Sequence, residues 1–167
     1  MGAEIQMFTD GACRGNPGPG GYGVVIQTPE GTRTLSGGFR STTNNRMELM
    51  AVIAGLEAAG EGARIRLFTD SKYVADAINL GWAARWRKNG WKRNKSDYAE
   101  NTDLWEKALT LLAERTVRVE WVRGHAGNRN NNTADRLAVA ASHAKHLEVD
   151  TGFEGWKTIR KAPTLSD

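Results

Sequence analysis

Apolar and polar residues alternate at the start of the chain with the two-residue period of a β-strand. The alternation over residues 5–10 predicts a strand that ends at Asp10. A dense group of glycines and prolines around Asn16 predicts the turn that follows. Two further strands are predicted at residues 22–28 and 32–40, joined by a short turn. The chain therefore opens as an antiparallel meander.

Farther along, apolar residues recur every three or four positions, which is the spacing of amphipathic helices. The predicted helices cover residues 47–57 before a stop at Gly60, residues 73–80 before Gly81, a short segment from Trp82, residues 104–112 and residues 133–147. Two more strands are predicted at residues 65–70 and 117–121. The polar segments at residues 87–101 and 123–132 are predicted to be loops.

This order of elements predicts an α/β fold with a five-stranded mixed sheet. Three strands are antiparallel, two further strands run parallel to the first because crossovers are right-handed, and helices cover both faces. A chain of 167 residues is long enough for one hydrophobic core, so one domain is expected. We place that domain at residues 1–153 and a C-terminal tail at residues 154–167.

Composition and charge narrow the class of protein. About 40% of the residues are hydrophobic and 25% are charged, which is typical of a globular domain, and no apolar run approaches the roughly 18–20 residues of a membrane span. No secretory signal is recognisable at the start, and the single Cys13 fits a reducing compartment. We therefore expect a cytoplasmic protein without membrane contact. The pI near 9.4 favours a polyanionic partner.

The tripeptide Phe-Thr-Asp occurs twice, ending at Asp10 and at Asp70, and each copy closes a predicted strand. The carboxyl ends of parallel strands meet at one edge of a sheet, so the two carboxylates are expected to lie close together. Like charges repel, and burial raises the cost of keeping them ionised. A cation between the two side chains is the simplest explanation of this repeat.

Two more acids, Glu48 and Asp135, stand near the starts of predicted helices. Each acid has a structural alternative. Asp10 could form an Asx-turn and Asp70 could cap a helix, while Glu48 could join a capping box with Asn45 and Asp135 could favour the helix dipole. All four nevertheless face the same rim in this topology, and one site is simpler than four coincidences.

Ligands that are all oxygen select hard cations such as Mg²⁺ or Mn²⁺. Zinc is disfavoured, because the one cysteine and three histidines show no ligand spacing. Two hard cations about 3.5–4 Å apart can activate a water molecule and stabilise the leaving oxygen of a phosphodiester. The acids therefore favour metal-assisted phosphoryl chemistry.

Several motifs resemble those of a known family. They are DGACRGNPGPGGYG at residues 10–23, TNNRMEL at 43–49, TDS at 69–71, and GHAG at 124–127 followed by AD at 134–135. Their order and spacing resemble a type 1 ribonuclease H of the bacterial cellular kind, from the first strand to about residue 153. The resemblance implies a ribonuclease H-like fold, a catalytic domain at residues 1–153, and a monomer without an obligatory protein partner.

The same resemblance implies an endonuclease that hydrolyses the RNA strand of RNA–DNA hybrids, without sequence preference, leaving 3′-hydroxyl and 5′-phosphate ends. Asp10, Glu48, Asp70 and Asp135 would be the catalytic carboxylates and would hold two Mg²⁺ ions, with Mn²⁺ as a substitute. His125 would move a proton or help the product leave, a task that suits a group titrating near neutral pH.

Other residues are candidates for binding the hybrid. An enzyme that cuts only RNA must sense the 2′-hydroxyl in the minor groove. The resemblance assigns this contact to backbone groups near Gly11 and Cys13 and to Asn16, Asn45 and Glu48, although Cys13 is equally well explained as a small packing residue. Thr43, Asn44 and Arg46 begin a helix whose backbone amides can hold a phosphate of the DNA strand.

A basic protrusion begins with the third predicted helix, where tryptophans alternate with lysines and arginines. It resembles the basic protrusion of the family, a second region that contacts the DNA strand by neutralising its phosphates. The candidates for this contact are Trp82, Arg85, Lys88, Lys92 and Trp105. Trp86 and Trp121 are predicted to be core residues.

Two residues depart from the family's pattern. Lys72 stands where many relatives carry glutamine, and its cation could contact a phosphate. Asn132 stands where relatives commonly carry glutamate.

Two rival functions stay open: a nuclease of the same superfamily that acts on DNA, and a non-catalytic module that binds hybrids. The intact set of four acids argues against the second.

Overall fold

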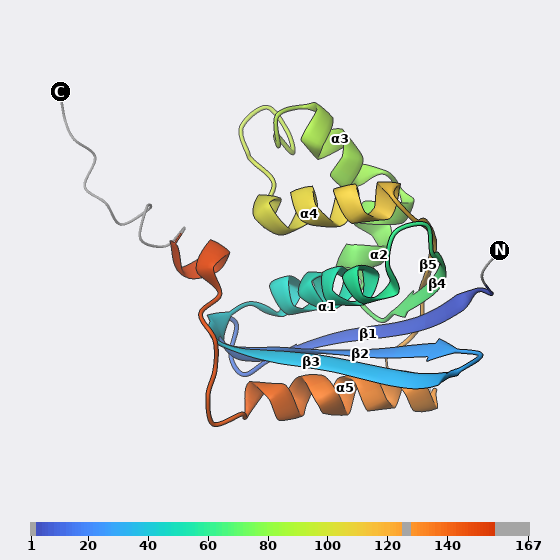
Figure 1. Ribbon diagram of the computed structural model, residues 1–167. Helices are drawn as coiled ribbons and strands as arrows, with labels where there is room; N and C mark the ends of the chain where they lie inside the picture. Colours follow the sequence, from blue (N-terminus) through green and yellow to red (C-terminus); the bar gives the residue numbers. More distant parts are fainter. Residues whose placement is uncertain (1–2, 125–127, 156–167) are drawn as a thin grey trace.

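The computed structural model describes residues 3–124 and 128–155. One mixed sheet forms the centre, with strands in the order β3-β2-β1-β4-β5 (Figure 1). The strands are β1 (Ile5–Cys13), β2 (Gly18–Thr28), β3 (Gly31–Thr42), β4 (Arg64–Thr69) and β5 (Thr116–Trp121). β1, β2 and β3 pair antiparallel, β4 pairs parallel with β1, and β5 pairs parallel with β4. The predicted α/β class and its strand directions are confirmed.

Helices cover both faces of the sheet, as predicted (Figure 1). They are α1 (Asn44–Ala59), α2 (Lys72–Asn79), α3 (Trp82–Lys88), α4 (Thr102–Ala113) and α5 (Arg129–Ser142). α5 lies along β1 and β2 on one face, and α1 lies on the opposite face with α4 packed against it. No helix in the described ranges is long and apolar enough to cross a membrane.

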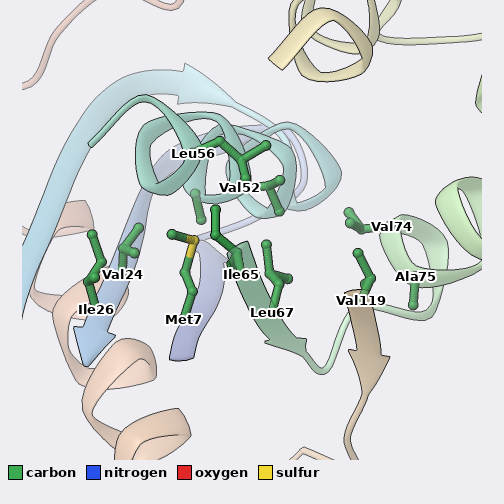
Figure 2. Close-up of a cluster of buried hydrophobic side chains, with 11 residues drawn as sticks. Met7, Val24, Ile26, Val52, Leu56, Ile65, Leu67, Val74, Ala75 and Val119 are labelled. Atoms are coloured by element: carbon green, nitrogen blue, oxygen red, sulfur yellow. The ribbon is translucent and has the colours of Figure 1, made fainter. Parts of the chain in front are cut away.

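The main core lies between the sheet and α1 (Figure 2). Alternate residues of a strand point to one face, so Met7, Ile65 and Leu67 face α1 together. Val52 and Leu56 meet them from one side of the helix. Full burial of one such side chain contributes about 1.5–3 kcal/mol. This layer fixes the distance between α1 and the sheet, and therefore the place of Glu48.

The opposite face carries a smaller apolar cluster beneath α5. Phe8 stacks on Phe68 of the neighbouring strand with ring centroids 4.9 Å apart, and Val25 and Ala134 complete the cluster. The helix approaches the sheet closely at Gly23, where a Cβ atom would meet the carbonyl oxygen of Ala134. This close packing brings the second turn of α5 down onto β1.

Several predicted boundaries are wrong. β1 continues past Asp10 to Cys13, because β2 begins early, at Gly18, and pairs with the added residues. The last helix spans residues 129–142 rather than 133–147. It begins early because the side chain of Asn128 accepts hydrogen bonds from the amides of residues 130 and 131. Residues 129–132 are therefore helical and not part of a loop.

The chain after α5 returns to the edge of β3 instead of extending the helix. The amide of Glu148 donates to the carbonyl oxygen of Gly38 at 3.0 Å, and the carbonyl oxygen of Glu148 accepts from Arg40 at 2.9 Å. Farther on, the guanidinium of Arg40 binds the carboxylate of Glu154 at 2.9 Å. The boundary between the domain and a tail at residue 153 stays a prediction, and residues 156–167 lie outside the described ranges.

Candidate active site

The repeated tripeptide brings two carboxylates to neighbouring strands. The parallel ladder of β1 and β4 pairs Phe8 with Phe68 and ends at the pair of Thr9 and Thr69, so that Asp10 and Asp70 follow it side by side. β4 ends here because the side chain of Thr69 accepts a hydrogen bond from the amide of Ser71, which caps α2. The predicted proximity of the two acids is therefore a consequence of strand register.

Glu48 reaches the same place from α1. The helix is capped by Thr43, whose hydroxyl accepts from the amide of Arg46 at 3.2 Å, so Asn45 does not form a capping box. Gly11 allows the helix to approach β1, since a Cβ atom there would meet the backbone nitrogen of Glu48. Asp10, Glu48 and Asp70 each offer a carboxylate oxygen, and these oxygens lie within 4.8 Å of one another.

Asp135 joins the group from the opposite face. It lies in the second turn of α5 and not in the first, which removes the helix dipole as an explanation for its charge. With Asp10, Glu48 and Asp70 it lines one cavity of about 390 Å³. The other lining residues are polar or small, namely Gly11, Asn44, Asn45, Ser71, Lys72 and Tyr73. The structure thus brings together the four acids that the sequence singled out.

A cation would stabilise this cluster, because its carboxyl groups are buried and repel one another when ionised. Burial, more than any other cause, raises the pKa of Asp10 to about 8, and the carboxyls of Asp70 and Asp135 add to the rise. Burial and then the charge of Asp10 raise the pKa of Glu48 well above its usual range. Glu48 is only 4% exposed, and its Oε2 atom has no hydrogen-bond partner among the described residues. A hard divalent cation fits this set of oxygens.

The rim of the cavity carries an unexpected pair. Trp121 was predicted to be a core residue, but it is 44% exposed because β5 is an edge strand and the residue lies at its end. Its indole nitrogen donates to the carbonyl oxygen of Asp70 at 3.1 Å. The ammonium of Lys72 lies 5.7 Å from the centre of the same ring. The indole therefore supports the backbone of Asp70 and holds a cation beside the acids.

The predicted RNA contacts have different surroundings. Gly11 and Asn45 line the cavity, whereas Asn16 is exposed and its side chain accepts from the amide of Asn44 at 3.0 Å. The thiol of Cys13 donates to two carbonyl oxygens, at 3.4 and 3.5 Å, and burial raises its pKa. The packing explanation of Cys13 is therefore well supported.

The predicted DNA contact of Trp105 is wrong, and the side chain of Arg46 is buried as well. Trp105 is 0% exposed, because its ring fills the space beneath α3 and its indole nitrogen donates to the hydroxyl of Tyr73 at 2.7 Å. Arg46 is 3% exposed, and its guanidinium donates to the carboxylates of Asp150 and Asp103, so the phosphate contact predicted for the backbone amides of this turn does not involve its side chain and stays a prediction. Trp86 packs edge-on against Trp105 with centroids 6.2 Å apart, as expected of a core residue.

The remaining candidates of the protrusion are exposed. They are Trp82, Arg85 and Lys88 on α3 and Lys92 in the loop that follows. His125 lies outside the described residues, and Asn132 is half-buried in the first turn of α5.

The sequence analysis did not identify Tyr73, which lines the cavity and whose hydroxyl joins α2 to α4. Its position three residues after Asp70 was the one available signal.

Comparison with known proteins decides the family. The family model described as RNase H matches residues 2–143. The chain belongs to the RNase H family. Ribonuclease H of Trichodesmium erythraeum is 55% identical to it over 151 residues, which cover 90% of this chain and 96% of the relative. Ribonuclease HI of Synechocystis sp. is 51% identical over 151 residues, with coverage of 90% and 94%.

Solved structures agree with the family. LC9-RNase H1, a type 1 RNase H with the type 2 active-site motif, superposes with a TM-score of 0.77 at 34% identity, covering 98% of this chain and 83% of that one. LC11-RNase H1, solved in complex with an RNA/DNA hybrid, gives a TM-score of 0.62 at 25% identity, with coverage of 83% and 96%. The expected resemblance to type 1 bacterial ribonucleases H is confirmed, and with it the class of a metal-dependent hydrolase.

Proposed function

We propose that this protein is an endonuclease that hydrolyses the RNA strand of RNA–DNA hybrids without sequence preference, leaving 3′-hydroxyl and 5′-phosphate ends. The observation that carries the proposal is the convergence of Asp10, Glu48 and Asp70 within 4.8 Å at the floor of an open polar cavity. Membership of the RNase H family supports it, as does the similarity to a protein solved with a hybrid.

Asp10, Glu48, Asp70 and Asp135 are the residues that would hold Mg²⁺, with Mn²⁺ as a substitute. Two such ions, when bound, supply an activated water and stabilisation of the leaving oxygen. The chain's own part is to fix the ligands before substrate arrives. The amide of Gly11 donates to Oδ1 of Asp10 at 2.9 Å, and the indole of Trp121 holds the carbonyl oxygen of Asp70. His125 is proposed to move a proton or to help the product leave.

The hybrid is proposed to lie across the cavity and α3. Asn44 and Asn45 line the cavity at the start of α1, where backbone amides favour a phosphate. Trp82 and the cations of α3, with three basic residues in its last turn, would neutralise the DNA strand on the far side. These phosphate contacts carry no sequence information, which fits cleavage without sequence preference.

A panel of substrates tests the proposed function. We expect cleavage of an RNA–DNA hybrid, with Mg²⁺ present, and none of matched DNA duplex, RNA duplex or single-stranded RNA. Calcium should support little cleavage because its longer and looser coordination spoils the alignment. Cleavage of the DNA duplex would favour the rival DNA nuclease, and tight hybrid binding without cleavage would favour the binding module.

Lys72→Gln tests the cation on the rim of the cavity. We expect a higher KM for the hybrid at moderate salt, because Lys72 lines the cavity of the acids, where its ammonium could contact a phosphate. The slope of log KM against log salt concentration should fall by about 0.7–0.9, the contribution of one phosphate contact. The matched control is Lys107→Gln, since that ammonium already binds Glu57 at 2.9 Å. An unchanged salt slope in Lys72→Gln would remove this contact from the proposal.

A further inference from the structure

Arg46 is held in the first turn of α1 by a saturated set of hydrogen bonds. Its Nε and Nη2 atoms donate to the carboxylate of Asp150 at 2.8 and 3.0 Å. Its Nη1 and Nη2 atoms donate to the carboxylate of Asp103 at 2.9 and 2.7 Å. A fifth bond joins Nη1 to the side-chain oxygen of Asn101 at 3.4 Å. A guanidinium has five N–H donors, so no donor of Arg46 is left for a phosphate.

Asp150 is the buried partner in this network. It is 1% exposed, and its Oδ2 atom also accepts from the hydroxyl of Thr42 at 2.7 Å. The backbone of the same segment lies directly on the ion pair. A Cβ atom at Gly152 would collide with the carboxylate of Asp103 and with the guanidinium of Arg46. The segment that follows α5 therefore closes over Arg46 and keeps water from its charge.

The network reaches the active site on two sides. Arg46 lies two residues before Glu48, and its amide is capped by Thr43 in the turn that carries the proposed phosphate-binding amides. On the other side, Asn101 donates to the hydroxyl of Tyr73 at 3.2 Å, and Tyr73 lines the cavity of the four acids. Hydrogen bonds through Arg46 therefore connect Asp150 to both walls of the cavity.

We propose that Asp150 is a positioning residue of the active site. By holding Arg46 it fixes the first turn of α1, and with it Glu48 and the amides that would bind the DNA phosphate. The first backbone N–H groups of a helix have no acceptor within the helix. The position of the first turn therefore depends more on side-chain contacts, such as those of Arg46, than the position of the middle of the helix does. The proposal rests on the proposed function, and it extends the functional unit beyond the residues 2–143 that the family model matches.

Asp150→Asn is the central variant, and Arg40→Gln is its matched control. Arg40 binds Glu154 of the same C-terminal segment but has no hydrogen bond to α1. Both full-length proteins are assayed well below their unfolding temperatures, with folding checked by circular dichroism. For Asp150→Asn we expect about a tenfold rise in the KM for hybrid and in the Mg²⁺ concentration for half-maximal rate, as for other groups that orient metal ligands. Arg40→Gln should match the wild type in both quantities.

A readout besides activity is Mg²⁺ binding by calorimetry without nucleic acid, which should weaken in Asp150→Asn and not in Arg40→Gln. Equal KM values and equal Mg²⁺ affinities in Asp150→Asn and wild type, with only a lower unfolding temperature, would overturn the proposal. If Asp150→Asn does not fold, Asp103→Asn carries the test with the same expected direction, since the side chain of Asp103 is 47% exposed. A wild type that binds Mg²⁺ but cleaves no hybrid would instead refute the proposed function, and calorimetry would still test Asp150.

Discussion

Replacing Asp10 by asparagine is expected to lower the rate of hybrid cleavage by about 10³-fold or more, the scale of losing a principal catalytic group. Asp10 stands between Glu48 and Asp70 in the cluster, and all three offer oxygens within 4.8 Å of one another. The amide of asparagine keeps the shape of the side chain but loses one anionic ligand. Single-turnover cleavage of a labelled hybrid at saturating Mg²⁺ measures the loss.

Binding of the hybrid should survive this substitution, because Asp10 lies on the floor of the cavity and the proposed phosphate contacts lie on α1 and α3. The control is Asp76→Asn on α2, a carboxylate that does not line the cavity. Retained turnover in Asp10→Asn would contradict the proposal that the acids hold the metal ions. Loss of both binding and cleavage would point to misfolding, which circular dichroism separates.

The same substitution is expected to stabilise the metal-free protein at high pH. The folded-state pKa of Asp10 is raised to about 8 from an ordinary value of 3.8, so between these pH values the folded state binds more protons than the unfolded state. The free energy of unfolding contributed by this group therefore falls as pH rises through that window. Each unit of pKa corresponds to about 1.4 kcal/mol. Asp10→Asn should thus gain several kcal/mol over the wild type near pH 9.

Urea unfolding in the presence of a chelator, repeated from pH 4 to pH 9, measures this gain. The difference between Asp10→Asn and wild type should be smallest at the acid end of this range, and it should vanish only below the unfolded-state pKa of 3.8, where the carboxyl is protonated in both states of the wild type. Saturating Mg²⁺ should stabilise the wild type and reduce the advantage of the variant, since a bound cation offsets the repulsion among the acids. Parallel stability curves over the whole pH range would contradict the raised pKa of Asp10.

The sheet and its acids could be predicted from the sequence, because the patterns that mark them lie within short stretches of the chain. Two-residue alternation identified β1, β4 and β5, and the rule of right-handed crossovers gave their relative directions. Strand register then placed Asp10 beside Asp70. Positions near the starts of predicted helices singled out Glu48 and Asp135, whose approach depends on α1 and α5 packing against opposite faces of the sheet.

The surroundings of the acids were harder to predict. Trp105 and Trp121 have the same chemistry, yet one is sealed between helices and the other is exposed at the end of an edge strand. Arg46 belongs to a motif that suggested a phosphate contact, but two carboxylates from distant parts of the chain enclose it. Exposure depends on which elements pack together, and residue type alone does not contain that information.

The sequence by itself determined the fold class and the neighbouring placement of Asp10 and Asp70, and it predicted a hard cation. These follow from short-range periodicity and from the chemistry of the ligands. Only the tertiary structure decided that Asp150, 104 residues from Arg46, closes over the first turn of α1. A buried charge must be paired, and the partner can come from any segment that the fold brings near, so no local pattern marks it.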